Sequence, residues 1–373
     1  MRAEVAIVGN GVAGYACSAR LARHGIRPLL VGPGLPIDRP PLTKQGLARG
    51  APVLLADENR LADLGIERLD AMVDEADLAT SRLVAGGIEI EAEVVVLATG
   101  LSYRPPRISG LEVAHVNATP RGMTRLVAAL AGGPKRVVVV GAGLIGTETA
   151  ATLAAAGHDV TALDVLGRPL DRLHDPLSKL GAAALAEAGA RFVGGAELTE
   201  LVAEHENENE QVTVCYKGGS LIADVVVAAT GGRAFVPPGL DVDVGELPLA
   251  VDRDLRVPGH ARVHAVGDLI LAPHARFGPI RFPHWDMAVA TGDRAADAIA
   301  GVVSELDRLP YWWTDIGPRT FAEVGWAEAA AGWEEEDGIH VGRDTTGEAV
   351  AALVVDDPRR LRAARALLDA GGP

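Results

Sequence analysis

Two short runs of consecutive apolar residues, 5–8 and 137–140, give the first indication of how this chain folds. Aliphatic and β-branched residues without polar interruption are typical of strands buried on both faces of a parallel sheet. Each run leads into a glycine-rich turn and then into a helix-like stretch, over residues 15–24 and 147–156. The pattern therefore predicts two strand–turn–helix units of the same kind, about 130 residues apart.

A second pair of apolar runs extends the similarity between the two halves of the chain. Residues 94–97 lead into Ala-Thr-Gly, and residues 225–228 lead into the same tripeptide. Each run follows a stretch of alternating polar and apolar residues, 83–90 and 212–216, which predicts a hairpin or a three-stranded insert. The period is too long for a solenoid, so it indicates duplication of a whole domain.

The turns after the first runs carry the spacing Gly-x-Gly-x-x-Gly in both copies. The first glycine allows a tight bend, the second lets the backbone approach a pyrophosphate, and the third lets helix and strand pack closely. The phosphates then bind to the free N–H groups and the positive dipole end of the helix. The six glycines are Gly9, Gly11 and Gly14 in the first copy and Gly141, Gly143 and Gly146 in the second. Two such turns in one chain predict two bound nucleotides, a flavin and a nicotinamide dinucleotide.

Two carboxylates stand at the ends of predicted strands, where each can bind a sugar or polyol. Asp164 follows the strand-like residues 159–163, the position from which a carboxylate binds the ribose 2′-OH of NAD and repels the 2′-phosphate of NADP. Asp268 follows residues 263–267 and precedes a helix-like segment, 285–298. It is placed to accept hydrogen bonds from the ribityl chain of a flavin. We therefore expect FAD and NADH as cofactors, with NADH preferred over NADPH.

Composition and charge exclude some classes of partner. The formal net charge of −15 argues against general nucleic-acid binding and against binding to an anionic membrane. No apolar run approaches the roughly 18 residues that cross a bilayer, and the first strand leaves no room for a signal peptide, so we expect a cytoplasmic protein. The two cysteines, Cys17 and Cys215, are far apart, which argues against a redox dithiol and a cysteine-bound iron–sulfur cluster. We predict no metal site.

Two further segments give the chain a family resemblance. Residues 36–44, Pro-Ile-Asp-Arg-Pro-Pro-Leu-Thr-Lys, resemble a segment of the oxygenase-coupled ferredoxin reductases. Residues 310–315, Pro-Tyr-Trp-Trp-Thr-Asp, are similar to the opening of the C-terminal domain of that family. Together with the glycine turns, the two Ala-Thr-Gly strands and the Ala-Val-Gly-Asp segment, they resemble the FAD-dependent pyridine-nucleotide oxidoreductases. The resemblance covers residues 1 to about 365.

The resemblance implies roles for residues at the flavin. Arg39 and Lys44 would face the FAD, with Lys44 near the reactive edge of the ring system, where a cation stabilises negative charge on the reduced flavin. Glu148 matches a glutamate that pairs with this lysine close to where the hydride arrives. Asp268 would hold the ribityl chain, and the backbone around Trp285 would meet the pyrimidine end of the flavin.

The resemblance also implies contacts with the nicotinamide cofactor. Trp313 is expected to line the site opposite the nicotinamide, with a place in the protein core as the alternative. Arg168 matches a family arginine that contacts the cofactor. We also count as cofactor-binding positions Val73, Ala98, Thr99, Gly100, Thr230 and Gly231.

The sequence departs from the family pattern in three places. Residues 29–34 end the second strand of the first half without the acidic residue that binds the FAD adenosine ribose, so weaker FAD binding is expected. Pro283 stands where the family has glutamate and leaves His284 beside the expected flavin edge, either as a proton donor or as a packed ring. The C-terminal domain is short, with a strand over 320–324, a hairpin up to residue 355 and one helix over 358–368.

These observations predict an α/β protein with two doubly wound, Rossmann-like nucleotide-binding domains, one inserted in the other, and a small α+β C-terminal domain. The expected domains are FAD-binding over residues 1–104 and 232–309, NAD-binding over 105–231 and C-terminal over 310–373. Residues 104–107 and 237–239, which are rich in proline, would mark the crossings between domains.

The predicted function is that of an enzyme, an NADH-dependent ferredoxin reductase. Hydride passes from NADH to flavin N5, and single electrons then pass to a small iron–sulfur protein that serves an oxygenase or P450. One alternative is a self-contained reductase or oxidase acting on oxygen, a quinone or a small-molecule intermediate. The other is an NADH-sensing interaction protein of the apoptosis-inducing factor type. The candidate catalytic residues are Lys44, Glu148, Trp313 and His284.

The expected partner is a ferredoxin or another small iron–sulfur protein, with no nucleic acid and no membrane. The oligomeric state is left open between monomer and homodimer.

Overall fold

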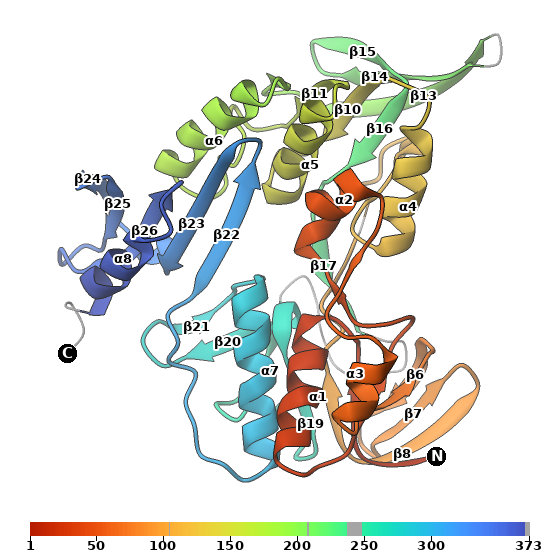
Figure 1. The fold of residues 1–373 in the computed structure, drawn as a ribbon, viewed down its shortest axis with the longest axis vertical. Helices are drawn as coiled ribbons and strands as arrows, with labels where there is room; N and C mark the ends of the chain where they lie inside the picture. The colour runs from red at the N-terminus through yellow and green to blue at the C-terminus, as the bar shows by residue number, and fades with distance from the viewer. Residues whose placement is uncertain (104, 207–208, 237–247, 370–373) are drawn as a thin grey trace. The chain divides into compact units, whose positions relative to one another are not determined.

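Two compact units make up the chain in a computed structural model that describes residues 1–103, 105–206, 209–236 and 248–369. The first unit comprises Met1–Arg39, Val53–Ser102 and Gly232–Pro310, and the second comprises Pro40–Pro52, Tyr103–Gly231 and Tyr311–Pro373. Each unit contains a parallel sheet and several helices (Figure 1).

The first unit is built on a seven-stranded sheet in the order β5-β2-β1-β8-β7-β6, with β19 paired to β8. Its strands are β1 (Arg2–Val8), β2 (Pro28–Val31), β5 (Glu67–Leu69), β6 (Val73–Asp77), β7 (Arg82–Ala85), β8 (Ile88–Leu97) and β19 (Val263–Ala265). β1 pairs in parallel with β2 and β8, and residues 5–8 are buried as their apolar run predicted. β6, β7 and β8 form the expected antiparallel insert.

Helices α1 (Val12–Arg23) and α7 (Trp285–Ile299) of the first unit lie side by side (Figure 1). Gly292 permits this close packing, because a Cβ there would stand 2.5 Å from the carbonyl oxygen of Ala13. The remaining elements are α3 (Glu58–Asp63) and the short strands β3 (Ile37–Asp38), β4 (Val53–Leu54), β9 (Leu101–Tyr103), β17 (Gly232–Ala234), β18 (Leu249–Ala250), β20 (Ile270–His274) and β21 (Gly278–Ile280).

The second unit repeats the strand arrangement of the first. Its parallel sheet has the order β12-β11-β10-β16, which corresponds strand for strand to β5-β2-β1-β8. The strands are β10 (Arg136–Val140), β11 (Asp159–Leu163), β12 (Arg191–Val193) and β16 (Val225–Ala228). Strands β13 (Leu198–Glu206), β14 (Asn209–Tyr216) and β15 (Gly219–Ala223) form the second antiparallel insert. The duplication predicted from the apolar runs is therefore present in the fold.

The helices of the second unit include one from the N-terminal part of the chain. They are α2 (Gln45–Arg49), α4 (Pro120–Ala129), α5 (Leu144–Ala155) and α6 (Asp175–Glu187). The segment that carries α2, Pro40–Pro52, belongs to this unit although residues on both sides of it belong to the first. The Thr152 hydroxyl of α5 donates to the carbonyl of Thr43 at 2.9 Å and holds the segment in place.

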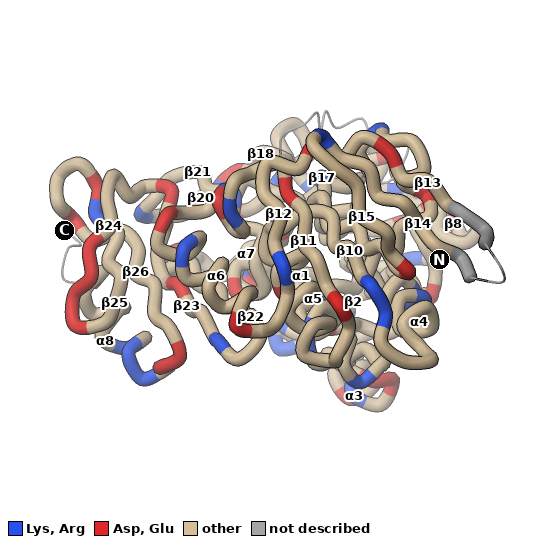
Figure 2. Tube along the Cα trace, turned by 90° about the horizontal axis from the view of Figure 1, so that it is seen from above, with Lys and Arg blue, Asp and Glu red and all other residues tan. Residues whose placement is uncertain are grey.

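The C-terminal part of the second unit is an antiparallel sheet in the order β22-β23-β26-β25-β24. Its strands are β22 (Tyr311–Ile316), β23 (Arg319–Gly325), β24 (Gly332–Glu336), β25 (Ile339–Arg343) and β26 (Ala349–Val355), followed by helix α8 (Arg360–Asp369). Figure 2 shows a continuous acidic stretch along β24, where Glu334 and Glu336 form ion pairs with Arg343 of β25. The strand, the hairpin and the helix predicted for this part are all present.

The predicted fold class is confirmed, with two Rossmann-like nucleotide-binding arrangements and a small α+β C-terminal part. Residue 104 and residues 237–239, expected at the crossings, lie outside the described residues. Across the described residues, no helix combines the length and the apolarity needed to span a membrane.

Candidate functional site

The first glycine turn combines two crowded positions with one open position. Gly9 has φ +110°, and a Cβ there would stand 2.3 Å from the carbonyl oxygen of Ala98. A Cβ at Gly14 would stand 1.9 Å from the carbonyl oxygen of Gly9. Gly11 is the N-cap residue of α1, and a Cβ there would meet no atom within 4 Å. The turn is therefore closed by backbone packing and open only where the helix begins.

The second glycine turn has the same geometry. Gly141 has φ +96°, and a Cβ there would lie 2.5 Å from the carbonyl oxygen of Ala229. A Cβ at Gly146 would lie 1.8 Å from the carbonyl oxygen of Gly141, whereas Gly143, the N-cap residue of α5, faces open space. Neither N-cap glycine has a side chain to accept from the first N–H groups of its helix. Both helix ends thus fit a bound pyrophosphate.

The threonine of each Ala-Thr-Gly segment forms a hydrogen bond near its glycine turn, Thr99 with a backbone carbonyl and Thr230 with a tyrosine hydroxyl. The Thr99 hydroxyl donates to the carbonyl of Phe235, and the carbonyl of Gly100 accepts from the Phe235 N–H at 3.0 Å. In the second unit, Thr230 lies 3.4 Å from the hydroxyl of Tyr103. The glycines that end the two segments, Gly100 and Gly231, both have positive φ. Ala98 and Val73 are buried, with Val73 at the start of β6.

Asp164 lies at the carboxyl end of β11, as the sequence predicted, and it also braces the second glycine turn. Its carboxylate accepts hydrogen bonds from the N–H groups of Ala142, at 2.6 Å, and Leu166, at 2.9 Å. Arg168 donates to Asp171 and Asp175, both at 2.9 Å. In this structure its guanidinium therefore pairs with carboxylates of its own loop.

The side chain of Asn10 explains why the first half has no acidic residue at the position that corresponds to Asp164. Gly32 corresponds to Asp164, since each follows the strand next to its glycine turn. A Cβ at Gly32 would stand 2.6 Å from Cγ of Asn10, whose amide donates to the carbonyls of Pro33 and Gly34. Asn10 thus occupies the space that a side chain at position 32 would need.

A carboxylate nevertheless reaches this turn from the neighbouring strand. Asp70, which follows β5, accepts a hydrogen bond from the N–H of Gly34 at 2.8 Å. Arg68 donates to the Gly34 carbonyl and forms an ion pair with Asp70 at 3.1 Å. The backbone hydrogen bond and this guanidinium lower the pKa of Asp70. Sequence reasoning missed Asp70 because it lies 36 residues beyond the turn.

The first unit contains four of the residues expected at the flavin, Arg39, Asp268, His284 and Trp285, and places Arg39 near Asp268. Asp268 follows β19, with the guanidinium groups of Arg39 and Arg281 near it. Burial raises the pKa of Asp268, and the two arginines act against that rise. His284 is the N-cap residue of α7, directly before Trp285.

The His284 ring packs against Phe282, with ring centroids 4.7 Å apart. Burial lowers the pKa of His284 to about 4. A ring with this pKa is neutral at neutral pH.

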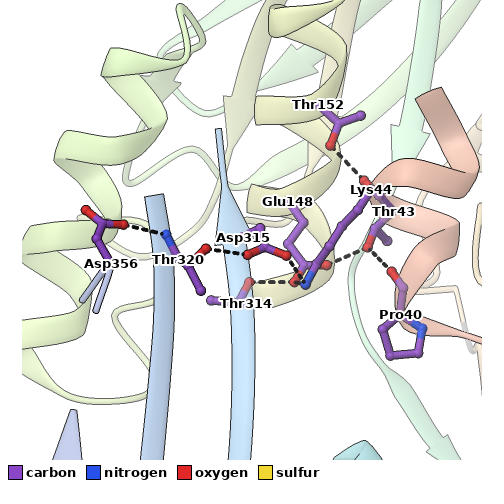
Figure 3. Close-up of polar contacts among 9 residues, drawn as sticks. All are labelled: Pro40, Thr43, Lys44, Glu148, Thr152, Thr314, Asp315, Thr320 and Asp356. Atoms are coloured by element: carbon purple, nitrogen blue, oxygen red, sulfur yellow. Dashed lines mark hydrogen bonds and ion pairs between the residues drawn. The ribbon is translucent and has the colours of Figure 1, made fainter. Parts of the chain in front are cut away.

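The second unit brings Lys44 and Glu148 together. The Lys44 Nζ lies 3.1 Å from Glu148 Oε1 and 3.2 Å from Asp315 Oδ2 (Figure 3). The Thr43 hydroxyl donates to Oε2 of Glu148, and the Thr314 hydroxyl donates to Oε1, both at 2.5 Å. One buried carboxylate thus receives polar contacts from two other segments of the chain, at residues 43–44 and at residue 314.

Glu148 is buried, and several hydrogen-bond donors surround its carboxylate. The residue is 7% exposed on α5. Burial raises the pKa of Glu148, and Lys44, Thr314 and Thr43 act in the opposite direction. Because Thr43, Thr314 and Asp315 come from distant segments, only the folded chain identifies them as members of this cluster.

Trp313 lies on β22 on the same face as Tyr311 and Asp315. Its ring stacks with that of Tyr311, with centroids 5.9 Å apart and an angle of 22° between the rings. Trp313 is half-buried, whereas its neighbour Trp312 is buried and donates from Nε1 to Glu323 at 2.9 Å. Of these two neighbouring tryptophans, Trp312 therefore lies in the core and Trp313 lies at its edge.

Comparisons with known proteins agree with this geometry. The family model described as pyridine nucleotide-disulphide oxidoreductase matches residues 3–292. The chain is 29% identical to the ferredoxin–NAD(+) reductase subunit of the benzene 1,2-dioxygenase system of Pseudomonas putida, over 99% of this chain and 93% of that protein. It is 30% identical to human apoptosis-inducing factor 3 over 87% of its own length, but spans only 55% of that protein.

The solved structures give the same result. The ferredoxin reductase for the CYP199A2 system from Rhodopseudomonas palustris superimposes with a TM-score of 0.87 at 25% identity, covering 98% of this chain and 94% of that one. A covalent putidaredoxin reductase–putidaredoxin complex matches with a TM-score of 0.86 at 23% identity, over 98% and 93% of the two chains, and so supports the fold alone.

Proposed function

Because the chain belongs to the pyridine nucleotide-disulphide oxidoreductase family, we propose that it is an NADH-dependent flavoprotein that passes single electrons to a small ferredoxin-type protein. The observation that carries the proposal is the pair of glycine turns, each closed by backbone packing and open at a helix N-terminus. The acceptor is proposed by analogy with the dioxygenase-system reductase subunit, which the chain matches along almost its whole length.

Each turn is assigned one nucleotide. FAD would bind at the first turn, with Asp268 accepting from the ribityl hydroxyls and Arg39 beside it. The nicotinamide dinucleotide would bind at the second, where Asp164 stands. When bound, a flavin accepts a hydride and releases electrons one at a time.

The Lys44–Glu148 cluster would set the charge at the reactive edge of the flavin. Lys44 supplies a cation, and Glu148 and Asp315 hold its ammonium group from two sides. Thr43 and Thr314 fix the orientation of the Glu148 carboxylate. A preorganised cation of this kind stabilises negative charge as it develops.

The preference for NADH is assigned to Asp164. Asp164→Asn keeps an oxygen for one of the two N–H groups that now donate to the carboxylate, and it removes the charge that would repel a 2′-phosphate. We expect the ratio of kcat/KM for NADPH to that for NADH to rise about tenfold, equivalent to about 1.4 kcal/mol. Steady-state reduction of an artificial acceptor measures this ratio, and an unchanged ratio would contradict the assignment.

The function is tested by anaerobic stopped-flow reduction of the FAD-loaded protein by NADH. The reduced protein is then mixed with a plant-type ferredoxin and cytochrome c, and separately with oxygen or a quinone. Fast reduction with ferredoxin-dependent cytochrome c turnover is the expected result. A chain that binds no flavin would overturn the proposal.

Two other outcomes identify the alternatives. Rapid reoxidation by oxygen or a quinone, with ferredoxin inert, would indicate a self-contained reductase. Slow reduction with a long-lived charge-transfer band would indicate an NADH-sensing protein of the apoptosis-inducing factor type, to which the similarity with apoptosis-inducing factor 3 points.

A further inference from the structure

In each unit, two neighbouring residues directly follow the edge strand of the parallel sheet and the strand beside it. In the second unit they are Asp164, after β11, and Gly194, after β12. In the first unit they are Gly32, after β2, and Asp70, after β5. The strands of each pair stay in register up to the residues just before these positions. The acid and the glycine have therefore exchanged strands between the two units.

Neither glycine position has room for a side chain. A Cβ at Gly32 would stand 2.6 Å from Cγ of Asn10. A Cβ at Gly194 would stand 2.6 Å from the carbonyl oxygen of Gly167. Each unit can therefore place an acidic side chain on only one of the two strands, which is β11 in the second unit and β5 in the first.

The two carboxylates nevertheless bind equivalent backbone groups. Oδ1 of Asp164 accepts a hydrogen bond from the N–H of Leu166 at 2.9 Å, two residues beyond the end of β11 and its acid. Oδ1 of Asp70 accepts a hydrogen bond from the N–H of Gly34 at 2.8 Å, and Gly34 lies two residues beyond Gly32. Although they come from different strands, the two carboxylates are anchored at the same position of the loop that follows β2 or β11.

A guanidinium group fixes the Asp70 carboxylate without covering it. Arg68 pairs with Oδ2 of Asp70 at 3.1 Å and with Glu58 at 2.7 Å, and it donates to the Gly34 carbonyl at 3.1 Å. The Arg68 side chain is 17% exposed, whereas the Asp70 side chain is 58% exposed. An ionised carboxylate accepts at about four lone-pair sites. Asp70 therefore keeps acceptor sites for the hydroxyl groups of a ligand beyond those that Gly34 and Arg68 use.

We infer that Asp70 is the carboxylate that binds the ribose hydroxyls of the FAD adenosine, in the place that Asp164 takes at the second turn. The inference rests on the proposed binding of FAD at the first glycine turn. Dinucleotide sites of this fold bind the ribose through a carboxylate near the end of the second strand, and here the next strand along the sheet supplies it. The lack of an acid in residues 29–34 then leaves the ribose with an acceptor all the same.

The inference is tested by comparing FAD with its 2′,3′-dideoxyadenosine analogue, which keeps the flavin and the pyrophosphate but lacks the adenosine ribose hydroxyls. Flavin is removed from the purified holoprotein, each ligand is added back, and the change in flavin absorbance and fluorescence gives its Kd. The intact protein should bind the analogue at least about tenfold more weakly than FAD. Asp70→Ala should bind FAD at least about tenfold more weakly than the intact protein, and should bind FAD and the analogue within about twofold of each other.

Asp77→Ala is the matched control. Asp77 is also an exposed carboxylate that accepts backbone hydrogen bonds, from the N–H groups of Ala79 and Thr80. Its register partners across β7 and β8 are Arg82 and Glu91, which lie level with the start of β1, at the end of the sheet away from the glycine turn. This variant should bind FAD within about twofold of the intact protein.

Asp70→Asn covers the case in which Asp70→Ala does not fold. It keeps an oxygen for the N–H of Gly34 and removes the charge, so the preference for FAD over the analogue should fall at least about threefold. An unchanged preference in the Asp70 variants would overturn the inference. Equal losses of affinity for FAD and for the analogue would do the same, because Asp70 would then only brace the loop. Failure of the intact protein to bind FAD would instead overturn the proposed function.

Discussion

At Gly11 and Gly143, an added methyl group should impair nucleotide binding without impairing folding. Both residues have φ near −72°, which any residue adopts, and both face open space. Alanine at either position is expected to change the free energy of unfolding by less than about 0.5 kcal/mol. The added methyl group would, however, stand between the backbone and a pyrophosphate.

The two substitutions should have different effects on the two nucleotides. Gly143→Ala is expected to weaken NADH binding at least about tenfold with normal FAD content, and Gly11→Ala to lower FAD content. Absorbance of the purified protein and NADH titration measure the two effects, and each variant is the control for the other. If Gly143→Ala lost FAD, the assignment of nucleotides to turns would be wrong.

His284 gives the protein a predicted dependence on pH. Burial lowers the pKa of the ring from 6.5 to about 4. The resulting stability is complete above pH 6.5, where the unfolded ring is also neutral, and is lost as the pH falls from 6.5 towards 4. His284→Asn places a residue that is favoured at helix N-caps at the start of α7 and removes the titrating ring.

Thermal unfolding between pH 7 and pH 5 tests this prediction. The melting temperature of the intact protein should fall more steeply with acid than that of His284→Asn. Parallel curves would mean that the ring does not titrate with a lowered pKa.

At the residue scale, sequence reasoning reached the residues whose spacing is local. The glycine turns and Asp164 were predicted because strand, turn and helix follow one another along the chain. Thr43, Thr314 and Asp315 were missed as members of the Glu148 cluster, because their contacts join segments more than 100 residues apart. Asp70 was missed because it acts from a neighbouring strand.

At the scale of elements, β23 is attached to α6 through a buried carboxylate. Glu323 is 3% exposed and accepts from Trp312 on its own sheet. It also binds His174, whose ring stacks on Trp333 with centroids 4.1 Å apart. The other nitrogen of His174 accepts from the Leu177 N–H at 3.4 Å, which favours the tautomer that donates to Glu323.

Removing this carboxylate should be costly because it leaves two buried donors without a partner. Glu323→Ala is expected to lower the free energy of unfolding by about 2–4 kcal/mol, as measured by urea denaturation. Glu323→Gln keeps an oxygen for one donor and should lose less. Equal losses in the two variants would mean that charge, and not hydrogen bonding, holds the helix to the sheet.

The strands and helices around the two glycine turns, together with α7 and α8, were predictable from the period of their apolar residues, within a few residues at each end. The helix expected over 285–298 is α7, and the hairpin inserts fall where alternation placed them. The segment Pro40–Pro52 was assigned with the N-terminal domain from its position in the sequence, whereas it packs in the second unit. Its partner, α5, begins about 90 residues later, a contact that no local pattern encodes.

At the scale of the whole molecule, residues 311–373 complete the second unit. Ile316 is fully buried, and its side chain would lie 3.6 Å from a Cβ at Gly181 of α6. Arg319 forms an ion pair with Glu187 at 2.9 Å. A chain that ends at Pro310 should therefore expose the covered faces of α5 and α6.

Such a truncated chain is expected to lose NADH binding and to unfold at lower urea concentration than the intact chain, because burial of apolar surface is the main source of stability. Fluorescence-monitored urea unfolding and NADH titration measure these effects. Unfolding at the same urea concentration as the intact chain would contradict this account of the C-terminal sheet.

Duplication and fold class were readable from the sequence because each half carries its own strand, turn and closing tripeptide. How the segments of the chain are divided between the two units could not be fully predicted from the sequence. Six segments alternate between the two units, so the chain passes from one unit to the other five times.

This alternation sets the order of events during synthesis. The first unit contains Met1–Arg39 but also Gly232–Pro310, so its sheet stays incomplete until β19 has left the ribosome. At translation speeds of roughly 5–20 residues per second, the earliest strands wait on the order of tens of seconds for that partner. The apolar strands of the first unit therefore stay without their last partner strand during this interval, and the second unit still waits for the residues that follow Pro310.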